Sequence, residues 1–287
     1  MAAIEVSVIV PARDAAATLE DQLDALAGQT FDGRWELVLV DDGSTDATAE
    51  IGVRWAERIP SLTVLSPVVP GGSSQARNVG TRVARGRLVA YCDADDVVST
   101  GWLAGLVSAL SHHEMATGPI DLARLNPHRV YAWRRTPGWW RPLPRWMGYL
   151  SPVMGCNMAV RRETFDLVGG FDESFGTGGD FDFSWRVQLA GGTVGFDLDA
   201  VVHWRLRLGW AYFRRSFEYG IGQVELYRGL RDQGLRRRLL RGVVLLAGVV
   251  LGAPLLLVPN YRYAWITLAG QELGRVKGSL QARTLYL

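Results

Sequence analysis

The sequence is poor in cysteine and lysine. Its 287 residues include two cysteines, Cys92 and Cys156, and one lysine, Lys277. Two cysteines cannot form a disulfide framework, so the sequence predicts a reducing compartment and two small core residues. The other 30 basic residues are arginine, which we attribute to a GC-rich genome rather than to chemistry. No leader with a charged and then apolar region precedes the apolar run at 6–10, so the sequence predicts no signal peptide.

Neither sign of charge dominates the chain, but the charges are unevenly placed. The net charge is +2; residues 1–100 hold 15 acidic and 8 basic side chains, whereas residues 205–241 hold 10 arginines and 3 acids. An acidic front suits a metal or phosphate site, and a basic rear suits an anionic surface. Nucleic-acid binding by the rear is a competing interpretation, which the acidic front and the apolar run at 242–258 disfavour.

Apolar, β-branched runs recur along the front of the chain and predict buried strands of a parallel sheet. The predicted strands are 6–10, 36–40, 62–65 and 88–92, and helices are predicted at 15–27, 47–58 and 75–80. Polar residues follow the strands at their carboxyl ends, where open α/β sheets bind ligands. No G-x-G-x-x-G follows the first strand, which disfavours a dinucleotide site. The pattern predicts a nucleotide-binding α/β half.

Three carboxylates, Asp93, Asp95 and Asp96, follow the strand at 88–92 within four positions. At the end of a buried strand they repel one another and resist desolvation. A Mg²⁺ or Mn²⁺ ion would offset that cost, usually together with the phosphates of a substrate. The competing interpretation is a solvated acidic turn that caps the next helix.

Two further loops carry polar groups that could serve a donor or only local structure. The run 41–46, DDGSTD, offers acidic and hydroxyl side chains, which also suit a helix cap and a tight turn. Gly71 and Gly72 either let backbone N–H groups approach a phosphate or form a plain loop. Arg77 and Asn78 then either hold pyrophosphate or lie on a surface helix face.

The middle of the chain predicts the acceptor side. Residues 114–154 hold four tryptophans among arginines and prolines, which favours either an acceptor-binding loop or ordinary packing under a long loop. We expect a short strand at 155–160 and helices at 102–113, 161–168 and 180–190. The last places Asp180 at a helix N-terminus, where an anionic base or a plain cap is stabilised. His203 lies in an apolar setting, where a core histidine is commoner than a ligand.

The chain resembles family 2 glycosyltransferases of the GT-A fold over roughly residues 4–205. The matching segments, in order, are VSVIVPARD (6–14), LVDDGSTD (39–46), ARNVG (76–80), YCDADD (91–96), GCNMAVRRETFDLVGGFDE (155–173) and GDFDFSWR (179–186). The resemblance implies an α/β fold with a Rossmann-like central sheet flanked by helices. It places the glycosyltransferase domain at 1–205 and leaves 206–287 as a basic and hydrophobic helical extension.

The resemblance also implies a role for individual residues. The donor-binding set is Pro11, Ala12, Arg13, Asp14, Asp42, Arg77, Asn78, Asp93 and Ala94; the ligands of Mg²⁺ or Mn²⁺ are Asp95, from the D-x-D motif, and His203; the catalytic base is Asp180; and the acceptor side holds Trp139, Trp140, Asn157, Gly179, Asp182 and Arg186. Two positions depart from the family pattern, because Gly179 replaces the usual Glu before the base and Asp14 replaces a common Asn.

The implied reaction is an inverting transfer from a nucleotide-diphosphate sugar, UDP-, GDP- or dTDP-linked, to a hydroxyl acceptor. We expect a lipid-linked or cell-envelope glycan as that acceptor, a polyprenyl-linked glycan being one form of the first. The alternative is a catalytically inactive relative that only binds nucleotide sugars. That alternative needs a lost carboxylate, and Asp42, Asp93, Asp95 and Asp180 are all present.

The rear of the chain predicts contact with a membrane at its cytoplasmic face. Residues 212–241 alternate aromatics and arginine, which suits a basic helix on an anionic membrane or a solvated helix packed on the domain. The run 242–258 has 17 uncharged residues, interrupted by Pro254, at the short limit of about 17–25 for a spanning helix. A span, a re-entrant segment or an interfacial hairpin anchored by Tyr261, Tyr263 and Trp265 would fit. The alternative is a buried helical pair, which could join copies into a homo-oligomer.

Overall fold

The computed structural model describes residues 3–59, 61–67, 69–134, 138–142, 144–237 and 239–286. In this part of the chain the main sheet has seven strands in the order β10-β6-β9-β4-β1-β2-β3. The strands are β1 (Val6–Ala12), β2 (Trp35–Asp41), β3 (Leu62–Leu65), β4 (Leu88–Tyr91), β6 (Met115–Thr117), β9 (Met158–Arg161) and β10 (Val194–Phe196). The predicted strands β1 to β4 are parallel to one another. β9 lies between β4 and β6 and is antiparallel to both.

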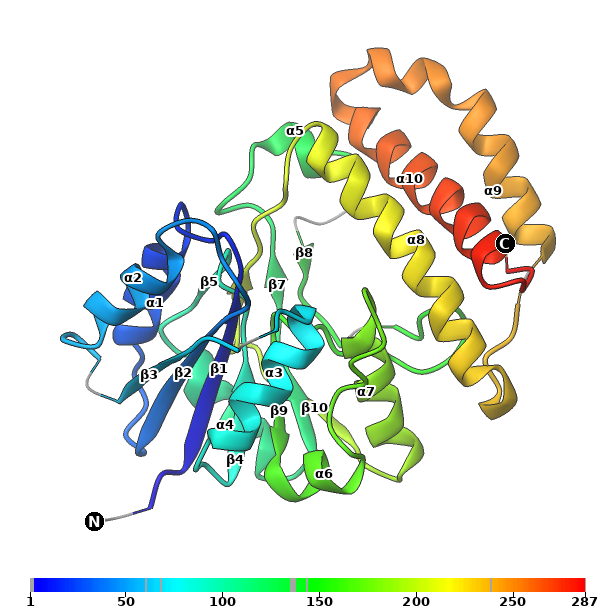
Figure 1. Ribbon diagram of the computed structural model, residues 1–287. Coiled ribbons are helices and arrows are strands. Elements are labelled where there is room, and N and C mark those ends of the chain that lie inside the picture. Colours follow the sequence, from blue (N-terminus) through cyan, green and yellow to red (C-terminus); the bar gives the residue numbers. More distant parts are fainter. Residues whose placement is uncertain are drawn as a thin grey trace.

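Helices cover both faces of this sheet (Figure 1). They are α1 (Leu19–Ala27), α2 (Thr48–Trp55), α3 (Gly72–Val83), α4 (Trp102–Leu110), α6 (Arg162–Leu167) and α7 (Gly179–Leu189). The short helix α5 (His128–Tyr131) instead packs against the last helix of the chain. Successive residues of β1 alternate between two apolar clusters, with Val8 and Val10 in one and Ile9 in the other. Burial on both faces explains why the strand is apolar throughout. Several predicted boundaries were wrong. The helices expected at 15–27 and 47–58 are shorter and run over Leu19–Ala27 and Thr48–Trp55, and the helix expected at 75–80 is longer. The helix expected at 102–113 ends at Leu110, and the strand expected from 155 begins at Met158.

A second, four-stranded sheet joins distant segments beside the carboxyl edge of the first. Its strands, in the order β5-β11-β7-β8, are β5 (Val97–Val98), β11 (Val202–His203), β7 (Ile120–Asp121) and β8 (Gly138–Trp139). In this register His203 lies opposite Val97 on one side and Asp121 on the other. The small sheet therefore carries His203 to the loop that holds the three carboxylates.

The rear of the chain is helical. Its elements are α8 (Trp210–Leu230), η1 (Arg231–Gln233), α9 (Leu239–Leu251), η2 (Ala253–Leu257) and α10 (Pro259–Gln281). Figure 1 shows α10 lying between α8 and α9. The basic helix expected over 212–241 ends at Leu230, and the run 242–258 is divided between α9 and η2. Within the described ranges, no helix combines the length and apolar character needed to cross a membrane.

Small residues let α8 and α10 approach very closely. A Cβ added at Gly274 would collide with the carbonyl oxygen of Phe217, and one at Gly220 would collide with that of Gln271. Backbone therefore faces backbone at this contact, and no side chain fits between the two helices. The closely packed helical pair is α8 and α10, whereas α9, which contains the first part of the apolar run at 242–258, packs on the outer side of α10. Val243, Val244 and Val250 of that run are exposed, so within this chain the run does not form the predicted buried pair.

Candidate active site

The expected donor-side residues lie at the carboxyl edge of three neighbouring strands. β1 pairs with β2 on one side and β4 on the other, and Ala12 is in register with Asp41. Asp42 follows β2, and Asp93 and Ala94 follow β4. The parallel sheet therefore brings these residues together, because the carboxyl ends of parallel strands meet at one edge.

Asp14 links the first loop to the second. Its backbone φ is +48°, in the left-handed region where Asn and Asp are enriched. Its Oδ1 accepts from the N–H of Thr45 at 2.8 Å, and its own N–H donates to the hydroxyl of Ser44 at 2.9 Å. Asn also suits this backbone and offers an equivalent acceptor oxygen, so the departure from the family pattern preserves the loop geometry.

Asp42 fixes the glycine loop instead of leaving it open. Its two carboxylate oxygens accept from the N–H groups of Gly71 and Gly72, each at 2.9 Å. The side chain is almost fully buried, with Arg13 at 3.7 Å. The N–H groups that the sequence offered to a phosphate therefore point at Asp42.

Arg77 orients Asp93. Its buried guanidinium donates to Asp93 Oδ1 at 2.7 Å and lies over the ring of Phe171. A Cβ at Gly155 would lie 2.7 Å from the guanidinium carbon, so only glycine leaves room for this arrangement. The arginine expected near the donor diphosphate is therefore paired with a donor-side carboxylate.

The expected donor contact by Asn78 is contradicted. Its amide nitrogen donates to the carbonyl of Phe171 and to Glu173, both at 2.8 Å, and its Oδ1 accepts from the N–H of Phe171 at 2.9 Å. The side chain is buried and its polar atoms are engaged within the protein. Asn78 therefore links α3 to the loop after α6. Of the two adjacent residues, only Arg77 faces the site.

The acidic loop is held by groups that are distant in the sequence. Gln22 of α1 donates to the carbonyl of Asp93 and accepts from the N–H of Val98, each at 3.0 Å. Asp96 is 0% exposed, and its Oδ1 accepts from the N–H of Arg205 at 2.8 Å. Its Oδ2 is buried and has no hydrogen-bond partner among the described residues. Burial and the charges of Asp95 and Asp93 raise the pKa of Asp96 well above its ordinary value.

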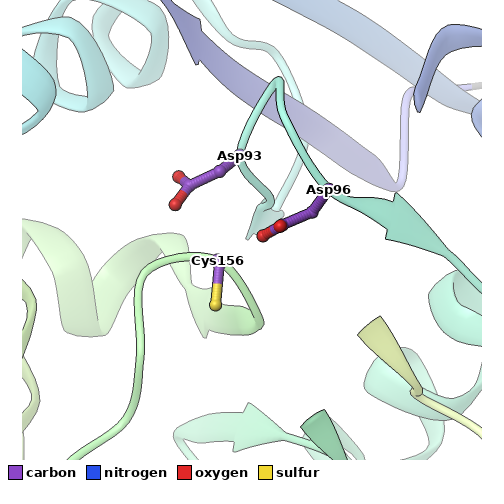
Figure 2. A group of neighbouring side chains, drawn as sticks. All are labelled: Asp93, Asp96 and Cys156. Atoms are coloured by element: carbon purple, nitrogen blue, oxygen red, sulfur yellow. The ribbon is translucent and has the colours of Figure 1, made fainter. Parts of the chain in front are cut away.

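The geometry of this loop fits a divalent cation. Ligand atoms of Asp93, Asp96 and Cys156 lie within 4.8 Å of one another, with the two aspartates on the loop between β4 and β5 and Cys156 on a second loop (Figure 2). An unpartnered buried carboxylate oxygen beside a second carboxylate is the oxygen donor set that Mg²⁺ and Mn²⁺ prefer. Burial raises the pKa of the Cys156 thiol, which disfavours the thiolate form that binds metals.

The two residues expected to bind the metal lie close to this group. Burial and the charge of Asp93 raise the pKa of Asp95, which is the neighbour in sequence of Asp96. His203 Nδ1 is 2.9 Å from Asp121 Oδ2. A carboxylate at Nδ1 is the usual partner of a metal-binding histidine, because it orients the ring and leaves the Nε2 lone pair for a ligand. In the described chain, neither Asp95 nor His203 belongs to the compact three-residue group of Figure 2.

Asp180 lies in the first turn of α7, as predicted. Its Oδ2 accepts from the N–H of Gly155 at 2.9 Å, and its Oδ1 accepts from the N–H of Phe181 at 3.0 Å. Gly155 therefore has two roles, since it donates to Asp180 and leaves space for Arg77. One glycine joins the candidate base to the arginine that orients Asp93.

The structure gives a physical reason for Gly179, the second departure from the family pattern. The residue is buried at the start of α7, and a Cβ added there would collide with the hydroxyl of Ser74 on α3. The Glu that is usual at this position does not fit unless Ser74 moves. The departure thus reflects close packing between α3 and α7.

The expected acceptor-side residues separate into polar side chains that have partners inside the protein and two tryptophans. Asn157 is fully buried: its Oδ1 accepts from Trp102, and its amide donates to the carbonyls of Pro119 and Ala200. This contradicts an acceptor contact. Asp182 and Arg186 form an ion pair at 2.7 Å that braces α7 from inside. Trp139 packs on Trp204 with ring centroids 5.8 Å apart, and Trp140 is 44% exposed.

Sequence reasoning missed several residues that hold the site. Arg205 donates from its backbone to Asp96 and from Nε to the carbonyl of Asp95 at 2.9 Å. Asp121 orients His203, and Gln22 holds both ends of the acidic loop. Gln22 could have been found in the sequence, because it is a polar residue on the apolar face of the helix predicted at 15–27. Nothing in the sequence distinguished Arg205 from the other arginines of the rear.

An open α/β sheet with clustered carboxylates at its carboxyl edge is the arrangement expected of a GT-A transferase, and the comparisons agree. The model of Glycosyl transferase family 2 matches residues 7–168, and that of Glycosyl transferase family group 2 matches residues 88–273. This chain belongs to glycosyl transferase family 2 and is a glycosyltransferase.

Similar proteins match most of the chain. The glycosyltransferase AglE of Haloferax volcanii is 28% identical over 280 residues, covering 93% of this chain and 87% of that protein. A PGL/p-HBAD biosynthesis glycosyltransferase of Mycobacterium bovis is 31% identical over 189 residues, covering 65% of this chain and 70% of that protein. The mannosyltransferase PcManGT from Pyrobaculum calidifontis, solved with GDP-Man and Mn²⁺, has a TM-score of 0.70 at 22% identity, covering 98% of this chain and 88% of that one. The last similarity confirms the GT-A fold.

Proposed function

We propose that this chain is a metal-dependent inverting glycosyltransferase that moves a sugar from a nucleotide-diphosphate sugar to a hydroxyl acceptor. The observation that carries the proposal is the position of Gly155. Its N–H donates to Asp180, and its α-carbon lies against the Arg77 guanidinium that binds Asp93. A candidate base and a candidate donor site are thereby fixed on opposite sides of one residue. The structural relative solved with GDP-Man and Mn²⁺ supports the same class of donor and cation.

The chain's own groups account for the proton transfer. Asp180 accepts the proton of the acceptor hydroxyl while its two backbone N–H partners keep the carboxylate in place. The hydroxyl oxygen attacks the anomeric carbon, and the bond to the diphosphate breaks on the opposite face. This inverts the configuration through an oxocarbenium-like transition state.

The carboxylates of the acidic loop would hold the cation. Asp95 and His203 are the ligands that the resemblance implies, and Asp96 offers the buried oxygen without a partner. Bound there, a divalent cation would neutralise charge that develops on the diphosphate leaving group.

A donor screen tests this proposal. Purified protein is incubated with Mn²⁺ and a panel of UDP-, GDP- and dTDP-sugars, and nucleotide release is measured for wild type, Asp95→Ala and Asp180→Asn. We expect one donor to be hydrolysed by the wild type and spared by both variants. Nucleotide binding without release, even after polyprenyl-linked acceptors are added, would favour the inactive-relative alternative. No binding of any nucleotide would contradict the donor site.

We also propose that the surface formed by α9 and η2 contacts an anionic membrane surface and that the acceptor is lipid-linked. Apolar side chains are strongly exposed on it, including Val250 at 75%, Leu251 at 81% and Leu257 at 82%. Arg236 and Arg237 are exposed just before α9. An apolar surface next to arginine suits the boundary between headgroups and acyl chains.

The three expected interfacial anchors behave differently. Tyr261 is exposed, as that role requires. Tyr263 is buried against Tyr212, with ring centroids 4.9 Å apart, which contradicts its role as an anchor. Trp265 donates to the carbonyl of Val249 and ties α10 to α9. Tyr261 is therefore the one of these three that we retain as an anchor.

Vesicle sedimentation tests the membrane contact. We expect the protein to sediment with phosphatidylglycerol vesicles, and Leu251→Asp with Leu257→Asp to remain in the supernatant. Leu167→Asp is the matched control, because this exposed leucine lies on α6, outside the helical rear. If the double variant leaves sedimentation unchanged but converts a dimer to a monomer in light scattering, the surface joins two copies instead.

A further inference from the structure

One face of α8 lies against the loop that leads to Asp180. A Cβ on Gly222 would lie 2.5 Å from the carbonyl oxygen of Thr177, and the side chain of Leu226 lies 3.1 Å from the Cβ position of Gly178. Both contacts precede the first turn of α7. The position of this face of α8 is therefore fixed relative to the candidate base.

The same face continues towards the site. Residues 215, 219, 222 and 226 recur every three or four positions, so they form one stripe on α8. At about 1.5 Å per residue, Tyr219 lies roughly 4.5 Å along the axis from Gly222, and Arg215 about 6 Å further. The Arg215 guanidinium lies over the Tyr219 ring at 4.9 Å and donates to Glu218 at 3.3 Å.

Electrostatic effects agree with this placement. Burial raises the pKa of Tyr219, and the nearby charge of Asp180 adds to the rise. Burial also raises the pKa of Asp95, whereas the charges of Arg207 and Arg215 act in the opposite direction. The contacts of Arg205 give the direction of the stripe: Arg205 binds Asp96 and the carbonyl of Asp95, and α8 begins shortly after it at Trp210, so the end of the stripe that carries Arg215 is the end nearer the acidic loop.

Two other arginines that contact the acidic loop are already engaged. Arg77 is paired with Asp93, and Arg205 binds the carbonyl of Asp95 and the carboxylate of Asp21. Arg215 has a neighbouring glutamate, yet its side chain is 42% exposed and remains accessible. A guanidinium in this position can bind a phosphate through two N–H groups and stays charged at every physiological pH.

We propose that Arg215, stacked on Tyr219, binds a phosphate group of the substrates above the 93–96 loop. The inference rests on the proposed function, and it makes the helical rear a part of the active site. The phosphate could come from the donor diphosphate or from a polyprenyl phosphate acceptor. Its place at the end of the stripe nearer the acidic loop favours the donor diphosphate.

Titration calorimetry of the full chain tests this assignment. UDP and GDP are titrated with Mn²⁺, uridine and guanosine serve as ligands without phosphate, and farnesyl phosphate in detergent represents the acceptor. We expect Arg215→Ala to weaken binding of the preferred nucleoside diphosphate by about 10- to 100-fold, the usual effect of losing a charged hydrogen bond. Binding of the nucleoside should not change, and Arg215→Lys should restore part of the affinity.

Arg214→Ala is the matched control. Arg214 also donates to Glu218, at 3.2 Å, but its side chain is 74% exposed. This variant should bind nucleotides like the wild type. Arg215→Gln provides a second test if circular dichroism shows that Arg215→Ala does not fold.

The outcomes separate this inference from the proposed function. Loss of affinity only for farnesyl phosphate would keep the phosphate site and assign it to the acceptor. If Arg215→Ala changes neither the nucleotide affinity nor the farnesyl phosphate affinity, and the wild type binds nucleotide, the role of Arg215 alone would be overturned. A folded wild type that binds neither class of ligand would overturn the proposed function and this inference with it.

Discussion

The front and rear of the molecule are stabilised in different ways. At the carboxyl edge of the sheet, polar groups are held by directional hydrogen bonds, and one buried carboxylate oxygen, Oδ2 of Asp96, has no partner among the described residues. In the rear, α8 and α10 meet through glycines, and apolar side chains are exposed on α9 and η2. The front is thus arranged for charge and the rear for packing. Changes at the front should therefore alter activity most, whereas changes at the rear should alter stability.

The strongest test of this contrast is Asp180→Asn. Loss of a general base typically lowers turnover by about 10²- to 10⁴-fold. The amide nitrogen of asparagine cannot accept one of the two backbone N–H bonds, so the variant should also lose about 1–3 kcal/mol of stability, a smaller effect than the loss of turnover. Initial rates of sugar transfer measure the first effect and calorimetry the second. Asp172→Asn is the control, because this exposed residue accepts hydrogen bonds from Ser174, for which asparagine still offers an acceptor oxygen. A loss smaller than tenfold would remove Asp180 from the chemistry.

In the rear, Gly274→Ala should mainly destabilise the protein. The added methyl group meets the Phe217 carbonyl, and overpacking of this kind costs about 3 kcal/mol. Urea unfolding measures the loss. Gly229→Ala on α8 is the matched control: its Cβ would contact only the Phe175 ring, at 3.8 Å. It should stabilise the helix by about 0.5–1 kcal/mol. Equal effects of the two variants would contradict the close contact of α8 and α10.

Gly155→Ala should affect both activity and stability, since its Cβ meets the Arg77 guanidinium at 2.7 Å. We expect a loss of about 1–2 kcal/mol from overpacking, together with weaker nucleotide binding as Arg77 leaves Asp93. Urea unfolding and calorimetry measure the two effects. Gly176→Ala is the control, because nothing lies within 4 Å of its Cβ position. Unchanged nucleotide affinity in Gly155→Ala would separate the Arg77–Asp93 pair from donor binding.

Asp96→Asn should stabilise the acidic loop at the front of the molecule while it lowers the rate of sugar transfer. Replacing a buried carboxylate that lacks a partner is expected to add about 1–2 kcal/mol to the free energy of unfolding without metal. The sign depends on pH. Burial raises the folded-state pKa of Asp96, so the metal-free wild type loses stability as pH rises through that pKa.

The stability difference between Asp96→Asn and the wild type should therefore be larger at pH 7 than at pH 5. Urea unfolding in EDTA at both pH values measures it, and Mn²⁺ should stabilise the wild type more than the variant. A variant less stable than the wild type at pH 7 would show that the carboxylate is satisfied in the folded protein.

Local pattern was sufficient to predict the front of the fold. The apolar runs at 6–10, 36–40, 62–65 and 88–92 all became neighbouring parallel strands. Their order along the chain placed Asp42 and Asp93 at one edge, and helical spacing placed Asp180 at the start of α7. These features depend on hydrophobic periodicity and strand direction, which are properties of short segments.

The tertiary structure alone decided how each polar side chain is used. Asn78 and Asn157 looked like ligand-binding residues, but partners far away in the sequence bury and satisfy them. Gly155 looked unremarkable, but its position between Asp180 and Arg77 gives it two contacts at the site. The sequence by itself determined the strands, the edge and the acidic loop. Which polar atoms remain available to a ligand depends on contacts between residues 25 to 109 positions apart in the sequence, and no local pattern encodes them.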